Sequence, residues 1–78
     1  MKAESDKRYE AVMYTINGMD KMAYFDDSNR AYGWVKKRCE DYTRADIEYA
    51  AVVYDQHESR KRLLVIDRWF LLAGKNYR

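Results

Sequence analysis

Two side chains in this 78-residue sequence could carry nucleophilic or acid–base chemistry, namely its single histidine, His57, and its single cysteine, Cys39. His57 lies near Asp55, Glu58 and Ser59, which are residue types that a Ser–His–Asp arrangement uses. Nucleophilic catalysis needs a base that a third group orients, and neighbours within one turn-like segment rarely supply that geometry. We therefore expect His57 to be a solvent-exposed turn residue.

The other candidates for chemistry have simpler structural interpretations. Cys39 lies on the apolar side of a helical pattern, where a thiol behaves as a small hydrophobic group. A zinc site needs three or four ligands, and one cysteine with one distant histidine does not supply them. The acidic residues have no spacing that indicates an acid–base pair, and the three glycines are isolated, so they form no phosphate-binding loop. We expect no enzymatic activity, no metal and no cofactor.

Basic residues form two short clusters that could contact phosphate groups. Nucleic-acid binding would need both clusters to form one stripe, with tyrosines available to stack on bases. The net charge is only +2, with 15 Lys and Arg against 13 Asp and Glu, which argues against a strong phosphate-binding surface. A small nucleic-acid-binding regulator is therefore the alternative hypothesis, and its binding residues would be Lys36, Lys37, Arg38, Arg60, Lys61 and Arg62.

The elements that must position these residues begin with a hairpin. Residues 9–16 and 19–25 are rich in aromatic and β-branched types, and Asn17-Gly18 between them is a strong signal for a two-residue turn. With Asn17 and Gly18 as the central turn residues, Val12 faces Ala23. One face of this hairpin then carries four large side chains, which we predict to bind a partner protein: Tyr9, Met13, Met22 and Tyr24.

A helix and a second hairpin follow. Asp26-Asp27-Ser28 is typical of a helix start, and apolar residues recur at intervals of three and four up to residue 42, with Trp34 on the apolar side. Residues 47–55 and 62–70 are predicted strands. The order ββαββ predicts an α+β fold, a four-stranded antiparallel sheet with one helix packed on one face. We expect residues 1–8 to be a flexible N-terminal arm and residues 9–78 to form a single domain.

Composition excludes several classes of protein. An apolar fraction of 47% and an aromatic fraction of 15% are too high for a disordered chain. One cysteine excludes an internal disulfide, and no apolar run approaches the ~18 residues of a membrane helix. The polar first residues do not resemble a signal peptide. We expect a cytoplasmic protein with no membrane partner.

Apolar side chains lie on both faces of both predicted hairpins, and one helix can cover only one of these faces. Large exposed apolar patches mark sites of interaction. The C-terminal residues, a second copy of the chain in a homodimer, or another protein must therefore cover the remaining face. Tyrosine and methionine suit such a surface, because tyrosine is enriched at interface hot spots and methionine adapts to irregular partners.

The ββαββ order around Asn17-Gly18, with its helix from about Ser28 to Tyr42, resembles the small inhibitor proteins of phages and mobile elements, including anti-CRISPR proteins. The resemblance is to a class and matches no motif. It implies a non-enzymatic protein that binds a larger host machine for handling nucleic acid and blocks it sterically at a fixed stoichiometry.

Overall fold

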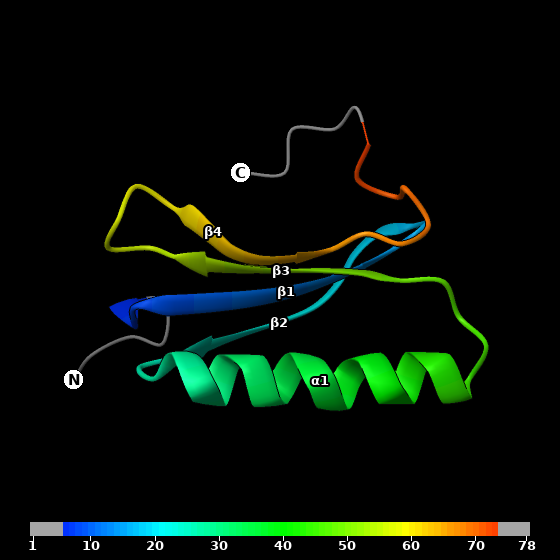
Figure 1. Cartoon of the computed structure of the whole chain (residues 1–78), viewed down its shortest axis with the longest axis horizontal. Helices are drawn as coiled ribbons and strands as arrows, with labels where there is room; N and C mark the ends of the chain where they lie inside the picture. The colour runs from blue at the N-terminus through cyan, green and yellow to red at the C-terminus, as the bar shows by residue number, and fades with distance from the viewer. Residues whose placement is uncertain (1–5, 74–78) are drawn as a thin grey trace.

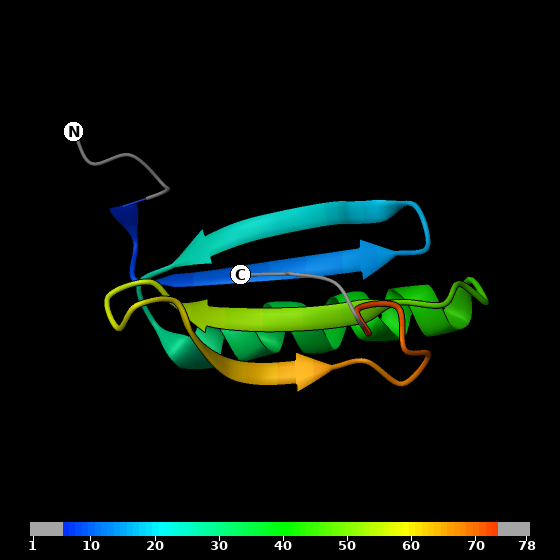
Figure 2. The same cartoon turned by 90° about the horizontal axis from the view of Figure 1, so that it is seen from above.

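The computed structural model describes residues 6–73, which form one helix and a four-stranded antiparallel sheet in the order β2-β1-β3-β4. The helix lies along one face of the sheet, and β2 and β4 are its edges (Figures 1 and 2). The predicted α+β fold is confirmed. The elements in chain order are β1 (Tyr9–Thr15), β2 (Gly18–Phe25), α1 (Ser28–Arg44), β3 (Ala50–Asp55) and β4 (Lys61–Ile66).

The first hairpin forms as predicted, but its register is different. Thr15 pairs with Gly18, so the turn residues are Ile16 and Asn17, and the positive φ of 104° falls on Gly18. Asp20 then has no partner in β1, because the register shifts between Tyr14 and Met13. From that point Ala23 pairs with Ala11, one position away from the predicted partner.

This shift separates the four residues that we predicted to share a face. A slip of one residue moves a strand's side chains to the opposite side of the sheet. Tyr9 and Met13 contact the helix-side core, whereas Met22 and Tyr24 pair with Val12 and Glu10 on the other face. The prediction that these four residues share one face of the hairpin is therefore wrong. The prediction placed Asn17 and Gly18 at the centre of the turn, both with positive φ. In the structure the central residues are Ile16 and Asn17, and the positive φ belongs to Gly18, the residue that follows them.

Helix α1 begins where its capping signal predicted. Asp27 is the N-cap, and its carboxylate accepts a hydrogen bond from the Asn29 N–H at 2.9 Å. The buried side chains of the helix are Ala31, Val35 and Tyr42, at intervals that trace one face. Trp34 lies beside them and packs against Phe25 with ring centroids 6.2 Å apart, so its predicted place on the packed side is confirmed.

Gly33 in this helix has no packing role in the structure. A Cβ atom built at Gly33 meets nothing within 4 Å, and the residue is exposed. Glycine in a helix interior costs about 1 kcal/mol relative to alanine. We expect Gly33→Ala to raise the free energy of unfolding by about that amount, measured by urea denaturation. An unchanged or lower value would show that Gly33 has a role that its surroundings do not reveal.

The strands of the second hairpin are shorter than predicted. The segment before β3 is not a strand, and β4 ends at Ile66 instead of residue 70. Asp67 causes this ending, because its carboxylate accepts the N–H groups of Leu71 at 2.7 Å and Leu72 at 3.0 Å. Those bonds close a turn, and the chain then folds back over the sheet.

Side chains fill a core on each side of the sheet. The helix side contains Met13, Val35 and Val53, and the opposite side, which we call the open face, has Val52 and Tyr54 at its centre. Leu71 and Leu72 pack on that centre, and Leu72 is 2% exposed. The C-terminal residues thus cover the middle of the open face, while Met22 at its β2 edge stays 40% exposed.

The end of the predicted flexible arm is held in place. Residues 1–5 and 74–78 lie outside the described residues, so the arm and the domain limits are described only from residue 6 to residue 73. Within that range, the backbone carbonyl of Arg8 accepts a hydrogen bond from the backbone N–H of Gln56 at 2.7 Å. The side-chain amide of Gln56 donates a second bond, also of 2.7 Å, to the backbone carbonyl of Lys7. The arm is therefore not free at Lys7 and Arg8. No helix in residues 6–73 is both long and apolar enough to cross a membrane.

Candidate functional site

The predicted protein-binding residues differ in their access to a partner. Met13 is completely buried, and Tyr9 packs on the same helix-side core. Met22 is exposed on the open face. Tyr24 is partly exposed there, and burial together with its hydrogen bond to Glu10 raises the pKa of its hydroxyl. Of this set, Met13 is closed to a partner, whereas Met22 and Tyr24 are accessible on the open face and Tyr9 is partly exposed on the helix side.

The two basic clusters do not form one stripe. Lys36 and Lys37 are exposed on α1, and Arg38 forms a 3.1 Å ion pair with Asp41. Arg60, Lys61 and Arg62 lie at the β3–β4 hairpin, where Arg60 contacts the open face and Arg62 pairs with Tyr54. The sheet thus stands between the helix cluster and these arginines. The arrangement does not favour the nucleic-acid alternative.

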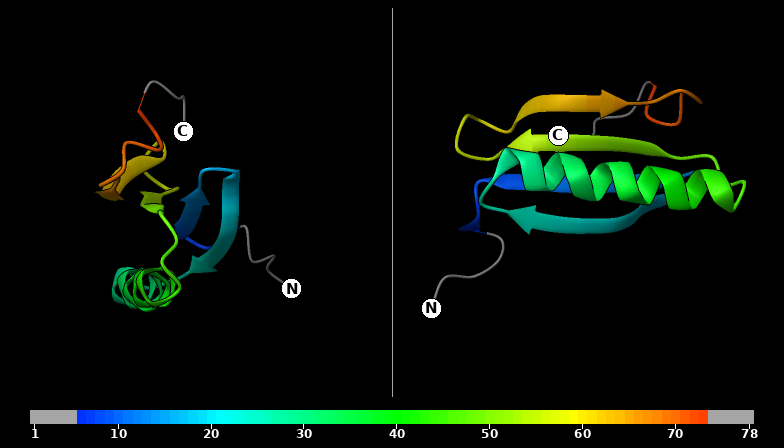
Figure 3. Two further views of the ribbon diagram at one scale, coloured as in Figure 1. Left: turned by 90° about the vertical axis from the view of Figure 1, so that its right-hand side faces the viewer. Right: turned by 60° about the horizontal axis from the view of Figure 1, so that its bottom comes forward.

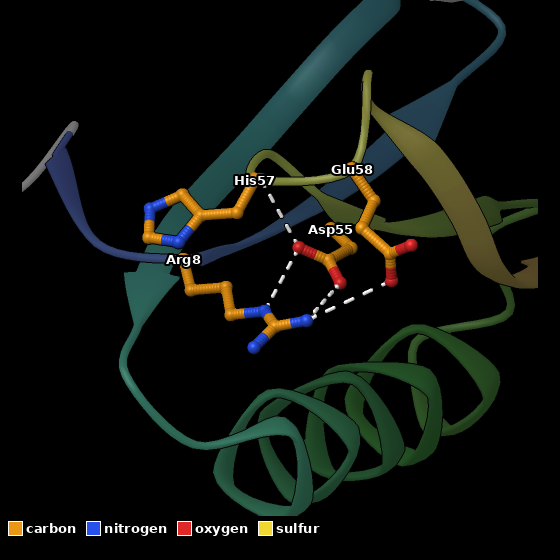
Figure 4. A network of polar contacts seen from close by, with 4 residues as sticks. All are labelled: Arg8, Asp55, His57 and Glu58. Carbon is orange, nitrogen blue, oxygen red and sulfur yellow. Dashed lines mark hydrogen bonds and ion pairs between the residues drawn. The ribbon is translucent and has the colours of Figure 1, made fainter.

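Sequence reasoning missed a polar network that ties the N-terminal residues to the end of β3. Arg8 donates two hydrogen bonds to the carboxylate of Asp55, at 3.0 and 2.8 Å, and Asp55 is 2% exposed. Figure 4 shows the same guanidinium reaching toward Glu58, 3.7 Å away. The hydrogen bonds from Arg8, together with the N–H of His57, hold the pKa of the Asp55 carboxyl below its usual value.

A second buried acid organises the open face. Glu10 is 5% exposed and forms a 2.7 Å ion pair with Arg60, whose guanidinium lies 4.0 Å from the centroid of the Tyr54 ring. Burial and a hydrogen bond to Tyr54 raise the pKa of the neighbouring Tyr14 hydroxyl. Arg60 adopts a positive φ of 55°, and so does Ser59 before it. The backbone of this turn directs Arg60 onto the sheet, so we assign the residue a structural role.

The two candidates for nucleophilic chemistry are placed as expected. His57 is exposed in the turn after β3, and its described contact with Asp55 comes from its backbone N–H. Cys39 is partly buried against the helix-side core, and burial raises the pKa of its thiol, which disfavours the reactive thiolate. Among residues 6–73, no three His, Cys, Asp or Glu side chains are grouped to hold a metal ion.

Three connections lie at the right-hand end of Figure 1, namely the β1–β2 turn, the segment between α1 and β3, and the segment after β4, and each carries an exposed apolar residue. Ile16 in the β1–β2 turn is 75% exposed, Ile47 between α1 and β3 is 43% exposed, and Phe70 after β4 is 77% exposed. We call these three residues and the loops that carry them the loop end. It is the part of the described chain where large apolar groups are most accessible.

Phe70 occupies an unfavourable position in two respects. Its φ is 57°, in the left-handed region that a bulky residue rarely adopts, and its ring is exposed. The neighbours of Phe70 explain how the position is held. Trp69 packs on Tyr49 with centroids 4.7 Å apart on the helix side, whereas Leu72 is buried on the open face. The chain therefore crosses from one core to the other, and Phe70 lies at the crossing.

Two open hollows flank Ile47 at this end. One, of about 330 Å³, is bordered by Ile47, Arg68 and Trp69. The other, of about 450 Å³, is bordered by Ile16, Ile47 and Tyr42, and its floor includes the hydrogen bond from the Tyr42 hydroxyl to Asp20. Burial and that bond raise the pKa of Tyr42, so the hydroxyl remains a neutral donor. These hollows can receive side chains of another protein, and the exposed apolar groups beside them can contact that protein.

Sequence reasoning assigned Phe70 to a strand, because six of the nine residues from 62 to 70 are aliphatic or aromatic. Asp67 was the available signal, since aspartate often caps a turn through nearby backbone N–H groups.

Comparisons of the chain with protein-family models, with curated proteins and with solved structures found no match.

Proposed function

We propose that this protein is a non-enzymatic binding module that inhibits a larger protein by covering a site on it with the loop end. The observation that carries the proposal is Phe70, which is 77% exposed at a φ of 57°. Strained backbone persists only where the surrounding structure holds it, and such positions cluster at functional sites. A left-handed conformation costs roughly 1–2 kcal/mol for a residue with a Cβ atom.

The chemistry around Phe70 supports a protein partner. Aromatic side chains that enter a pocket on a partner are typical hot spots, and smaller apolar neighbours exclude water around them. Ile47 borders one hollow with Trp69, the residue before Phe70, and it borders the other hollow with Ile16, so both hollows can accept side chains of a partner beside exposed apolar groups. The Tyr42 hydroxyl and the Asp20 carboxylate at this end are hydrogen-bonded to each other, and this pairing supports occlusion rather than catalysis by these two groups.

The identity of the partner rests on the class resemblance. The small inhibitors that this chain resembles act on host machines that handle nucleic acid, and we extend that target class to this protein. Steric inhibition needs no base-reading surface on the inhibitor. The sheet separates the helix cluster from Arg60 and Arg62, which is consistent with this mode and does not favour direct binding of DNA or RNA.

The test replaces Phe70 with glycine. Glycine adopts a positive φ freely, so Phe70→Gly removes the ring and the strain together, and the melting temperature should stay level or rise. Binding to the partner should weaken about 30-fold or more, which corresponds to a hot-spot loss of about 2 kcal/mol. The partner is captured on tagged protein from host cells, identified by mass spectrometry, and then titrated in purified form.

Ser59→Gly is the matched control. Ser59 has a φ of 55° and is exposed, but it lies in the β3–β4 turn at the opposite end of the sheet. This variant should gain the same relief of strain and bind as the wild type. Inhibition of the purified partner should be complete at an equimolar ratio. The proposal fails if Phe70→Gly binds and inhibits as well as Ser59→Gly does.

A further inference from the structure

The free edge of β2 has a charge pattern that can pair with itself. β2 and β4 are the two edge strands, and Figure 3 shows that α1 lies under the sheet and leaves the outer side of β2 uncovered by described elements. Unpaired backbone groups along such an edge can pair with another strand. β2 carries Asp20 and Lys21 side by side, whereas the charges of β4, Lys61 and Arg62, are both positive.

The bulge in β2 sorts its side chains between the two faces. Met19 and Met22 pair with Tyr14 and Val12, which belong to the open face. Lys21 pairs with Met13 of the helix-side core, and Asp20 accepts the hydroxyl of Tyr42 from α1. The two charged residues thus lie on the helix side, and the two methionines lie on the open face.

This sorting makes β2 self-complementary. Residues directly opposite each other in an antiparallel pair lie on the same face of the sheet. If Asp20 lies opposite Lys21 of a second copy, then Met19 lies opposite Met22 of that copy, and both pairs share a face. Without the extra residue at Asp20, Met19 and Met22 would lie on different faces and this register could not form.

We propose that two copies of this chain associate through antiparallel pairing of their β2 strands in this register. Two Asp20–Lys21 ion pairs then form on the helix side, and two Met19–Met22 contacts form on the open face. Lys21 has no ion-pair partner among the described residues of its own chain, and the side chain of Met19 is 58% exposed. Association supplies a partner to the first and covers the second.

The same charges select against other strands. A charged residue on an edge strand discourages pairing with unrelated strands, because most partners leave the charge unmatched. β4 has no acidic residue, so pairing of β4 with its own copy would form no ion pair. A second copy of β2 is the occupant that satisfies Asp20 and Lys21 together. This inference uses the edge of the sheet and does not depend on the proposed function of the loop end.

The test uses two charge variants, alone and mixed. In Asp20→Lys, lysines face each other across the two-fold axis, and in Lys21→Glu, acidic groups do. Each variant should be monomeric at concentrations where the wild type is dimeric, as measured by sedimentation and light scattering over a wide micromolar range. Mixed in equal amounts, the two variants should associate, since each acidic residue then faces a lysine.

Several outcomes would overturn the inference. These are a wild type that stays monomeric throughout, a dimer that survives Lys21→Glu, or a mixture that does not associate. Lys21→Glu keeps the Tyr42–Asp20 hydrogen bond, so it tests the register even if Asp20→Lys does not fold. Phe70→Gly should leave the dimer intact, and loss of partner binding in that variant would test the proposed function separately.

Discussion

Replacing Met13 with glutamate should unfold the protein at neutral pH, because the side chain of Met13 is completely buried in the helix-side core. Truncating a buried methionine to alanine costs about 2–5 kcal/mol, and glutamate adds the penalty of burying a charge without a partner. A domain of this length has a free energy of unfolding of roughly 4–12 kcal/mol. The loss of packing and the burial of the charge together cost nearly that much. Circular dichroism and urea denaturation measure the outcome.

Met22→Glu is the matched control for this experiment. Met22 is 40% exposed on the open face, so a carboxylate there stays in water and the fold should survive. The comparison is made on dilute protein, where association contributes little to stability. The register predicted from Asn17-Gly18 places both residues on one face, so it predicts similar effects. Equal melting temperatures for Met13→Glu and Met22→Glu would contradict the register that the structure shows.

Replacing Asp55 with asparagine should remove much of the acid sensitivity of the fold. The hydrogen bonds from Arg8 lower the pKa of Asp55 in the folded protein below the value of about 3.9 in an unfolded chain. The folded state therefore binds the proton less readily than the unfolded state does. The stabilisation is fully present above that unfolded value, and it is lost as the pH falls through the lowered pKa of the folded state.

The expected result is a difference that depends on pH. Asp55→Asn should melt several degrees below the wild type at neutral pH, because Arg8 loses the charge of its partner. The difference in melting temperature should begin to shrink below about pH 4, where the unfolded chain takes up the proton. It should vanish once the pH falls below the lowered pKa of folded Asp55, where the wild-type carboxylate is also neutral. Thermal melts across this range measure it.

Glu58→Gln provides the control, since Glu58 is 59% exposed and 3.7 Å from the same guanidinium. An exposed ion pair of this kind contributes about 0–1 kcal/mol. This variant should keep the acid sensitivity of the wild type. A gap between Asp55→Asn and the wild type that persists unchanged in acid would show that the charge of Asp55 does not stabilise the fold.

The two predictions concern residues whose burial the sequence alone did not indicate. Met13 was assigned to a partner-binding face, and Asp55 to the end of a predicted strand, beside a polar turn. Both are buried in the structure, and the burial depends on β1 lying between β2 and β3. Local spacing does not contain that information, because the neighbours of a central strand are distant in sequence. The nearest candidate for a catalytic group, His57, was correctly placed on the surface, because its assignment needed only the local turn.

The residues predicted to bind a partner likewise depend on contacts that local spacing does not show. Met22 and Tyr24 lie on the open face, where a partner can reach them, whereas Tyr9 and Met13 lie on the helix side. Phe70 was missed as an exposed residue because the aliphatic and aromatic residues of 62–70 resemble those of a strand. Its exposure results from two anchors, Trp69 on Tyr49 and Leu72 on the open face, which belong to different cores.

The sequence by itself determined the order of elements, the helix start at Asp27 and the packing side of Trp34, because capping and helical periodicity act between residues a few positions apart. The tertiary structure decided the strand order, the register beyond Asp20 and the pairing of Arg8 with Asp55. These depend on contacts between segments far apart in the chain. One unpaired residue in β2 was enough to exchange the faces, since side chains alternate along a strand with a period of two.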